Sequence, residues 1–169
     1  MNKDLIKNIK KYIKDNYKEE KRTGIFAKRK FKEKSFSSSD MLFEKCQAFI
    51  DVDFKIKDTW QQSVFHFIDL KGYKDPDVYK RANLSKQTFS KIRSDMYYQP
   101  NKDTALQMCI GLMLNIDETK DLLAKAGFAL SNGIKRDLVV RYFIENEIYN
   151  VDELNLILDE LSLKLFPIN

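Results

Sequence analysis

Apolar residues return every three or four positions along most of this chain, and that spacing constrains its fold more than any other feature. The interval is the period of one face of an α-helix, and no strong strand is predicted. Only 5 Gly and 3 Pro interrupt the 169 residues, and no internal repeat is present. The sequence therefore predicts an all-α fold with one buried core, because the chain is too short for a multi-domain assembly.

Capping residues predict where the helices beyond Trp60 begin and end. A first helix is expected to stop at Gly72, since glycine adopts the left-handed conformation of a helix terminus at little cost. The next is expected to have Asp75 as its N-cap and Pro76 in its first turn, and Ser85 is expected to open a third. Further helices are expected over residues 104–114, 117–127, 137–147 and 152–161.

The N-terminal third is predicted to hold one amphipathic helix, over residues 3–18. Its apolar face consists of Leu5, Ile6, Ile9, Tyr12, Ile13 and Tyr17. A stripe of this size favours docking on a partner or on the body of the protein over docking on a membrane. Residues 19–40 lack a period and are interpreted as a basic linker, and residues 40–54 as another helix.

These patterns divide the chain into three segments. Residues 1–40 form the amphipathic helix plus the basic linker, and residues 41–136 form a helical domain whose core spans residues 64–127. Residues 137–169 carry the two terminal helices, which are acidic outside and apolar within. Their apolar surface is expected either to pack on the domain or to form a dimer interface.

The formal net charge of +5 is unevenly distributed along the chain. Residues 1–34 carry 13 Lys and Arg against five acids, and residues 71–93 carry seven against two. The intervening and terminal segments are acidic. A basic surface that faces a polyanion is one interpretation, because neutralising phosphates releases condensed counterions. For residues 1–34, a lysine-rich face in contact with solvent remains the alternative.

The sequence offers no catalytic or metal-binding motif. Its single histidine, His66, stands among apolar residues and is expected to pack in the core. Cys46 and Cys109 have no partner at a disulfide or metal spacing and are expected to be small buried side chains. No segment has the length of a membrane span or the form of a secretory signal. We therefore expect a cytoplasmic protein that is not an enzyme and holds no cofactor or metal.

Residues 77–93 are predicted to form a helix, a tight turn and a second helix. The inward-facing positions are Val78, Ala82, Leu84, Phe89 and Ile92. Lys86, Gln87, Ser90, Lys91 and Arg93 are left to face solvent. This is helix-turn-helix geometry, in which the second helix enters the major groove of DNA.

Residues 64–127 resemble the five-helix DNA-binding domain of the lambda-repressor-like (Cro/C1, Xre) family. The resemblance rests on Leu84-Ser85 in the turn, Thr88-Phe89-Ser90-Lys91-Ile92 in the second helix, Pro100 with Thr104, Leu106 and Leu112, and Asn115-Ile116-Asp117-Glu118 with Leu122-Leu123. The chain departs from the family at Tyr79, Asn83 and Arg93. As a whole it is similar to a poorly characterised group of bacterial helix-turn-helix proteins, in which a tyrosine at the position of Tyr79 is usual.

The resemblance implies a sequence-specific transcriptional regulator that binds double-stranded DNA as a homodimer. The implied DNA-binding residues are Ser85, Lys86, Gln87, Ser90, Lys91 and Arg93, with Lys86 and Gln87 at base edges. Candidate phosphate contacts are Lys28, Arg29, Lys30, Lys80 and Arg81. The main alternative is a non-enzymatic adaptor, related to phage or stress, that uses the same helices on a protein partner. Binding of RNA through the basic linker is a third interpretation.

Overall fold

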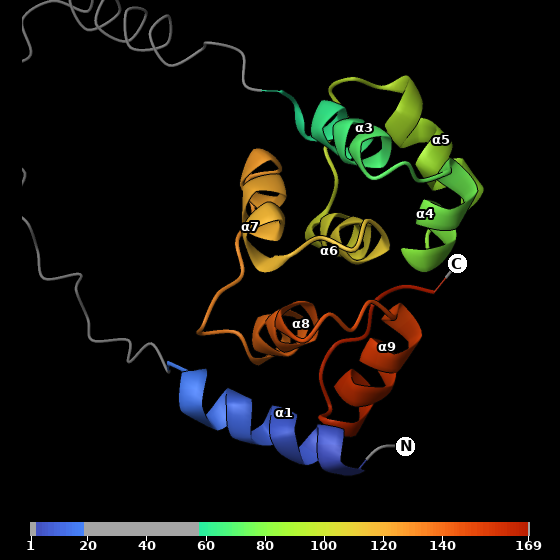
Figure 1. Cartoon of the computed structure of the whole chain (residues 1–169). Helices are drawn as coiled ribbons and strands as arrows, with labels where there is room; N and C mark the ends of the chain where they lie inside the picture. Colours follow the sequence, from blue (N-terminus) through green and yellow to red (C-terminus); the bar gives the residue numbers. More distant parts are fainter. Residues whose placement is uncertain (1–2, 19–57, 169) are drawn as a thin grey trace, which may run out of the picture. The chain divides into compact units, whose positions relative to one another are not determined.

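The computed structural model describes residues 3–18 and 58–168, and within these ranges the chain is all-α, as predicted (Figure 1). The helices are α1 (Lys3–Asn16), α3 (Trp60–Leu70), α4 (Asp75–Arg81), α5 (Lys86–Ser94), α6 (Lys102–Gly111), α7 (Ile116–Lys125), α8 (Lys135–Glu145) and α9 (Val151–Glu160). The described residues include no strand. The predicted linker and the predicted helix over residues 40–54 lie outside them. None of the described helices has the length and apolar character needed to cross a membrane.

Side-chain caps fix the beginnings of most helices. Ser85, Asn101 and Asn150 accept hydrogen bonds from backbone amides at the starts of α5, α6 and α9. One predicted N-cap is wrong. Lys74, and not Asp75, is the N-cap of α4, since Asp75 already has helical geometry. Helix α7 begins at Ile116, one residue before the predicted start at Asp117, and Asn115 caps it in a capping box with Glu118.

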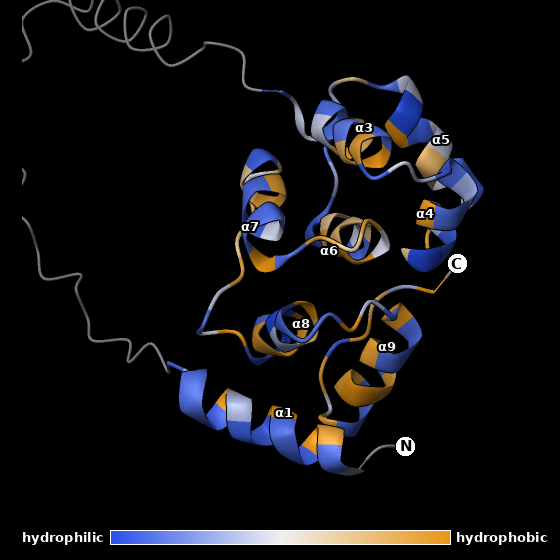
Figure 2. Ribbon diagram, in the orientation of Figure 1, coloured by the Kyte–Doolittle hydropathy of each residue, from blue (hydrophilic) through white to orange (hydrophobic). Residues whose placement is uncertain are grey.

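Helix α6 lies at the centre of the helical domain. All of its residues from Thr104 to Gly111 are buried, because α4 and α7 pack against it and Gln107 contacts the Pro167 carbonyl of the C-terminal tail. Helix α3 packs against α7, and α8 packs against α7 and α9. Figure 2 shows the hydrophobic residues of these helices turned toward one another. One continuous core therefore joins the helix-turn-helix segment to the terminal helices.

Helix α1 docks on the body of the protein through its apolar face. Ile6 and Ile9 are buried, and α1 packs along α8. The Tyr12 hydroxyl donates a hydrogen bond of 2.6 Å to the Glu145 carboxylate. Partial burial and this bond raise the pKa of Tyr12 to about 12, so the phenol keeps its proton and remains a donor. Beyond the helix, the amide of Lys18 donates to the carbonyl of Asn132.

The last helix agrees within one residue at each end with the prediction of a helix from Asp152 to Leu161, and the remaining residues form a tail. Helix α9 ends at Glu160, and Ser162 has a positive φ of 53° that reverses the chain direction. The following residues return to the core, where Phe166 is 2% exposed. Asn155 holds this tail by accepting from the Phe166 amide at 2.8 Å and donating to the Phe166 carbonyl at 3.1 Å.

Two single-residue predictions have opposite outcomes. The apolar neighbours of His66 in the sequence predict that it lies in the core, but the residue is exposed. Each step along a helix turns by about 100°, so those neighbours face other directions. Cys109 is buried, as expected, and burial raises the pKa of its thiol to about 12. The thiol therefore stays protonated and is a poor nucleophile. Cys46 lies outside the described residues.

A charged cluster joins α6 to α8 and to the C-terminal tail. Asp103 accepts from Arg136 at 2.6 Å and from Lys164 at 3.0 Å, and the Arg136 guanidinium lies 4.0 Å from the centre of the Phe166 ring. Burial raises the pKa of Asp103, but the hydrogen bonds and charges of Arg136 and Lys164 outweigh it and hold the pKa below its ordinary value. Asp103 thus stabilises the fold as an anion.

We expect Asp103→Asn to lower the free energy of unfolding by about 1.5–3 kcal/mol at neutral pH, the usual range for a hydrogen bond to a charged group. The folded-state pKa is depressed, so the contribution is present above the ordinary Asp pKa of about 3.9 and is lost as pH falls through the folded value. Urea unfolding at neutral pH and below about pH 3 should show the difference between the proteins shrinking in acid. Asp159→Asn, at an exposed position of α9, is the control. A difference that persists in acid would contradict this account.

Candidate nucleic-acid interface

The turn between α4 and α5 is built by buried apolar residues and one left-handed residue. Val78 and Ala82 are fully buried, and Leu84 is 6% exposed. Asn83 has a φ of 52°, a conformation that asparagine tolerates better than most residues. The Leu84 amide donates to the Tyr79 carbonyl at 2.8 Å. These contacts fix the direction in which α5 leaves the turn.

Helix α5 is held on the protein by its inward face, as the sequence predicted. Phe89 and Ile92 are buried. The Phe89 ring lies 5.9 Å from the Phe65 ring and 5.6 Å from the Tyr79 ring, measured between centroids. Tyr79, the residue that departs from the lambda-repressor-like pattern, is half-buried and packs on Phe89 beside the turn. The aromatic contacts give α5 a rigid base.

The outward face of α5 presents four of the six predicted DNA-binding residues together. Lys86, Gln87, Ser90 and Lys91 are all exposed. Within the part of the chain that the structure describes, their side chains form no hydrogen bond or ion pair. The helix contains no acidic residue. This face therefore combines positive charge with amide and hydroxyl groups that are free to contact a ligand.

Ser85 and Arg93, the other two predicted residues, are occupied by contacts within the protein. The Ser85 hydroxyl accepts from the Thr88 amide at 3.1 Å and lies 2.9 Å from the Thr88 hydroxyl, so it serves as the helix cap. Arg93 donates to Asp75 at 2.6 Å, and its guanidinium lies 4.3 Å from the centre of the Phe65 ring. Its side chain is 53% exposed, so part of its charge still faces solvent.

The predicted phosphate contacts are divided in the same way. Lys80 is exposed on α4. Arg81 instead turns toward α6, where it donates to the Gly111 carbonyl at 3.0 Å and lies over the Tyr73 ring at 4.3 Å. Lys28, Arg29 and Lys30 lie outside the described residues. Arg81 is therefore a structural residue that joins α4 to α6.

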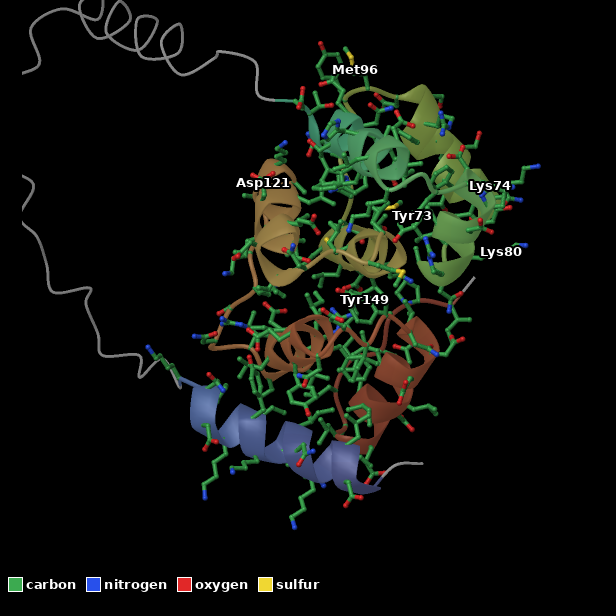
Figure 3. All side chains as sticks on the ribbon, viewed as in Figure 1. Tyr73, Lys74, Lys80, Met96, Asp121 and Tyr149 are labelled. Carbon is green, nitrogen blue, oxygen red and sulfur yellow. The ribbon has the colours of Figure 1, made fainter. Side chains whose placement is uncertain are left out.

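Sequence reasoning missed one cation at this surface. Lys74 precedes α4 and is exposed, and Figure 3 shows Lys74 and Lys80 on the outer side of α4. The position of Lys74 directly before the predicted helix start at Asp75-Pro76 could have indicated that this lysine lies at the surface beside α4. The first turn of α4 also carries Asp75 and Asp77. Asp75 is neutralised by Arg93, whereas Asp77 is exposed and would repel a phosphate placed at that helix end.

The turn is also tied to the C-terminal part of the chain. Asn83 donates to the Asp152 carboxylate at 3.0 Å, at the start of α9. The Gln107 amide nitrogen lies 3.0 Å from the Pro167 carbonyl and 3.4 Å from the Asn83 carbonyl. The terminal helices thus support the position of the turn.

A separate cavity of about 260 Å³ lies between α7, α8 and the loop that joins them. Its lining consists of Ile116, Lys120, Ala124, Phe128, Ala129, Leu130 and Arg141. Both of its cations are engaged, because Lys120 pairs with Asp117 and Arg141 pairs with Glu145. No group of three potential metal ligands occurs within residues 3–18 and 58–168.

No family model, no curated protein and no solved structure matches the chain. The assignment of a function therefore rests on the residues and geometry of the α4–α5 surface.

Proposed function

We propose that this protein is a cytoplasmic, sequence-specific DNA-binding transcriptional regulator of the Xre/lambda-repressor-like type, which acts as a homodimer. The observation that carries the proposal is the outward face of α5. Four polar or cationic side chains, at Lys86, Gln87, Ser90 and Lys91, are exposed there without a partner among the described residues. The opposite face of this helix packs in the core through Phe89 and Ile92. A rigid helix with such a face has the form that enters a major groove.

The chemistry of the face assigns roles to its residues. Lys86 and Gln87 occupy the first turn of α5, where recognition helices contact base edges. Lysine pairs with the guanine O6 and N7 acceptors, and glutamine pairs with the adenine N6 and N7 groups. In this proposal Lys91, farther along the helix, Lys74, directly before α4, and Lys80 on α4 contact phosphates, which set affinity and register without selecting sequence.

Removing the two base contacts is expected to reduce sequence-selective binding. Lys86→Ala with Gln87→Ala should weaken binding to the best duplex, obtained by selection from random sequences, by about 1–3 kcal/mol for each contact. The two losses together correspond to about thirtyfold or more in affinity. Affinity for unrelated duplexes should fall much less. Fluorescence anisotropy at fixed salt measures both quantities.

Lys120→Ala is the matched control, because it removes a positive charge from an exposed position of α7. It should leave both affinities almost unchanged. If the double variant binds its best duplex as tightly as the unchanged protein, α5 does not make the base contacts and the proposal fails.

One observation favours a protein-interaction adaptor as the second candidate. Met96 and Tyr97, directly after α5, are 44% and 71% exposed. Exposed methionine and tyrosine side chains are enriched at protein interfaces. Under this alternative, selection from random duplexes enriches no motif, and Tyr97→Ala abolishes a stoichiometric complex with a protein partner. An enriched motif that depends on Lys86 and Gln87 would exclude it.

A further inference from the structure

Helix α1 carries a second basic surface, separate from α5. Its lysine face consists of Lys7, Lys10, Lys11 and Lys14, all of them exposed, and the exposed Lys18 follows two residues beyond the end of the helix. At 100° per residue the four helical positions fall within an arc of about 100°, so they form one stripe along the helix. Their ammonium groups form no hydrogen bond or ion pair within the described residues. The two acids of this helix, Asp4 and Asp15, lie beyond one edge of the arc, one near each end of the helix.

We propose that the lysine face of α1 binds the sugar-phosphate backbone of duplex DNA without sequence preference. The proposal extends the proposed function, since it takes duplex DNA as the partner, but it uses different residues. From Lys7 to Lys14 the lysine face is about 10 Å long at 1.5 Å per residue. One strand of duplex DNA carries a phosphate about every 3.4 Å along the axis. The four helical ammonium groups therefore extend over the axial length of about three phosphates, and Lys18 adds a fifth cation beyond the helix end.

The packing of α1 argues for a phosphate backbone over a membrane. An amphipathic helix binds a bilayer by burying its apolar face in the acyl boundary. Here that face is already occupied, because Ile6 is 8% exposed, Ile9 is fully buried and α1 packs along α8. Only the charged side remains free, and charge without apolar insertion is typical of contacts to nucleic-acid backbones. Lys135 of α8, 5.4 Å from the Tyr17 ring, adds a cation at the C-terminal end of the stripe.

The two basic surfaces hold different segments of DNA. Helix α1 packs on α8, whereas α5 packs on α4, and Figure 1 shows α1 and α5 at opposite ends of the described helices. A duplex seated on α5 is therefore remote from the lysine face. The arrangement allows one protein molecule to join two duplex segments, one selected by sequence and one held by charge alone.

Charge removal on α1 tests the proposal in the full chain. The Gln variant combines Lys7→Gln, Lys10→Gln, Lys11→Gln, Lys14→Gln and Lys18→Gln. The Arg variant replaces the same lysines with arginine and keeps their charge, and both residues are good helix formers. For random-sequence duplexes, the plot of log affinity against log salt should become shallower in the Gln variant by about 0.9 for each phosphate that is no longer neutralised. Its affinity at low salt should fall at least about tenfold, whereas the Arg variant should match the unchanged protein.

A capture experiment tests whether a second duplex is held. A bead-bound duplex containing the selected site should retain a second, labelled random duplex in the presence of the protein. The Gln variant should lose this capture and still bind the bead-bound duplex. Capture that survives in the Gln variant, as expected if two α5 helices of a dimer bridge the duplexes, would overturn the proposal.

Two further outcomes would also overturn it. One is an unchanged salt dependence in the Gln variant with its circular dichroism intact. The other is a Gln variant that loses binding to phosphatidylserine vesicles while its DNA binding is unchanged, which would assign the lysine face to a membrane surface. Failure of the proposed function gives a different result. In that case Lys86→Ala with Gln87→Ala leaves the affinity for the selected duplex unchanged, whereas the Gln variant still shows the shallower salt dependence expected from the loss of the α1 lysines.

Discussion

Phe166→Ala is expected to lower the free energy of unfolding by about 3–5 kcal/mol, the usual cost of deleting a buried phenylalanine ring. The ring is 2% exposed and lies under the Arg136 guanidinium. Its backbone is held by both polar groups of the Asn155 amide, so the tail is unable to shift and fill the space. A cavity that the surroundings do not close gives the upper part of that range. Urea unfolding monitored by circular dichroism measures the change.

Leu165→Ala provides the matched control, because the neighbouring side chain is 40% exposed. Its expected cost is below about 1 kcal/mol, since little apolar area is lost. If Phe166→Ala leaves too little folded protein to measure, Phe166→Leu should cost about 1–1.5 kcal/mol and keep the same order of effects. Equal stabilities for the variants at positions 165 and 166 would show that the tail does not belong to the core.

The same tail should influence the helix-turn-helix surface. Gln107 contacts the Pro167 and Asn83 carbonyls together, so release of the tail removes one support of the turn. A folded Phe166→Leu protein is therefore expected to bind the selected duplex more weakly than Leu165→Ala does.

Gly111→Ala is expected to destabilise the protein by about 1–3 kcal/mol through overpacking. A Cβ atom at Gly111 would lie 2.6 Å from the Ala82 Cβ and 2.8 Å from the Val78 carbonyl oxygen. Backbone atoms of α4 are unable to move away as a flexible side chain does, and α6 is buried along this length. The higher helix propensity of alanine, worth about 1 kcal/mol at most, opposes the clash and does not cancel it.

Two further variants make this prediction specific. Gly127 has a φ of 76°, and no atom beyond its chain neighbours lies within 4 Å of the position that a Cβ would occupy there, so Gly127→Ala reports backbone strain alone, about 1–2 kcal/mol. Adding Ala82→Gly to Gly111→Ala removes the closest contact, and the double variant should lose less stability than the two single changes added together. Strict additivity of the two changes would contradict a direct clash between α4 and α6.

Much of the local structure could be predicted from residue spacing. Phe89 and Ile92 lie three positions apart and both face the core, which leaves the intervening polar residues on the outer side of α5. Ser85 caps its helix, as its residue type indicates. Two predictions, at His66 and at the start of α4, were wrong. The first came from the apolar neighbours of His66 and the second from the residue type of Asp75. The outcomes depended on the direction in which the His66 side chain points and on which residue is the first with helical geometry.

The availability of the cations was decided by tertiary contacts. Lys86, Lys91 and Arg93 are equivalent as basic residues of one short segment, yet among the residues that the structure describes only Arg93 meets a carboxylate, 18 positions away at the start of α4. Arg81 is similarly taken up by a carbonyl 30 positions away in α6. Spacing within one helix fixes which residues share a face, but it does not determine which distant groups lie opposite that face.

The sequence by itself determined the all-α class of the described residues, most of the helix ends and the outward face of α5, because these depend on interactions within a few positions. Only the tertiary structure decided where α1 docks, since its contact between Tyr12 and Glu145 spans 133 positions. That docking buries the apolar face of α1 and leaves its lysines outside. It also decided that the C-terminal tail ends in the core, because Asn155 and Phe166 meet only after the chain reverses at Ser162.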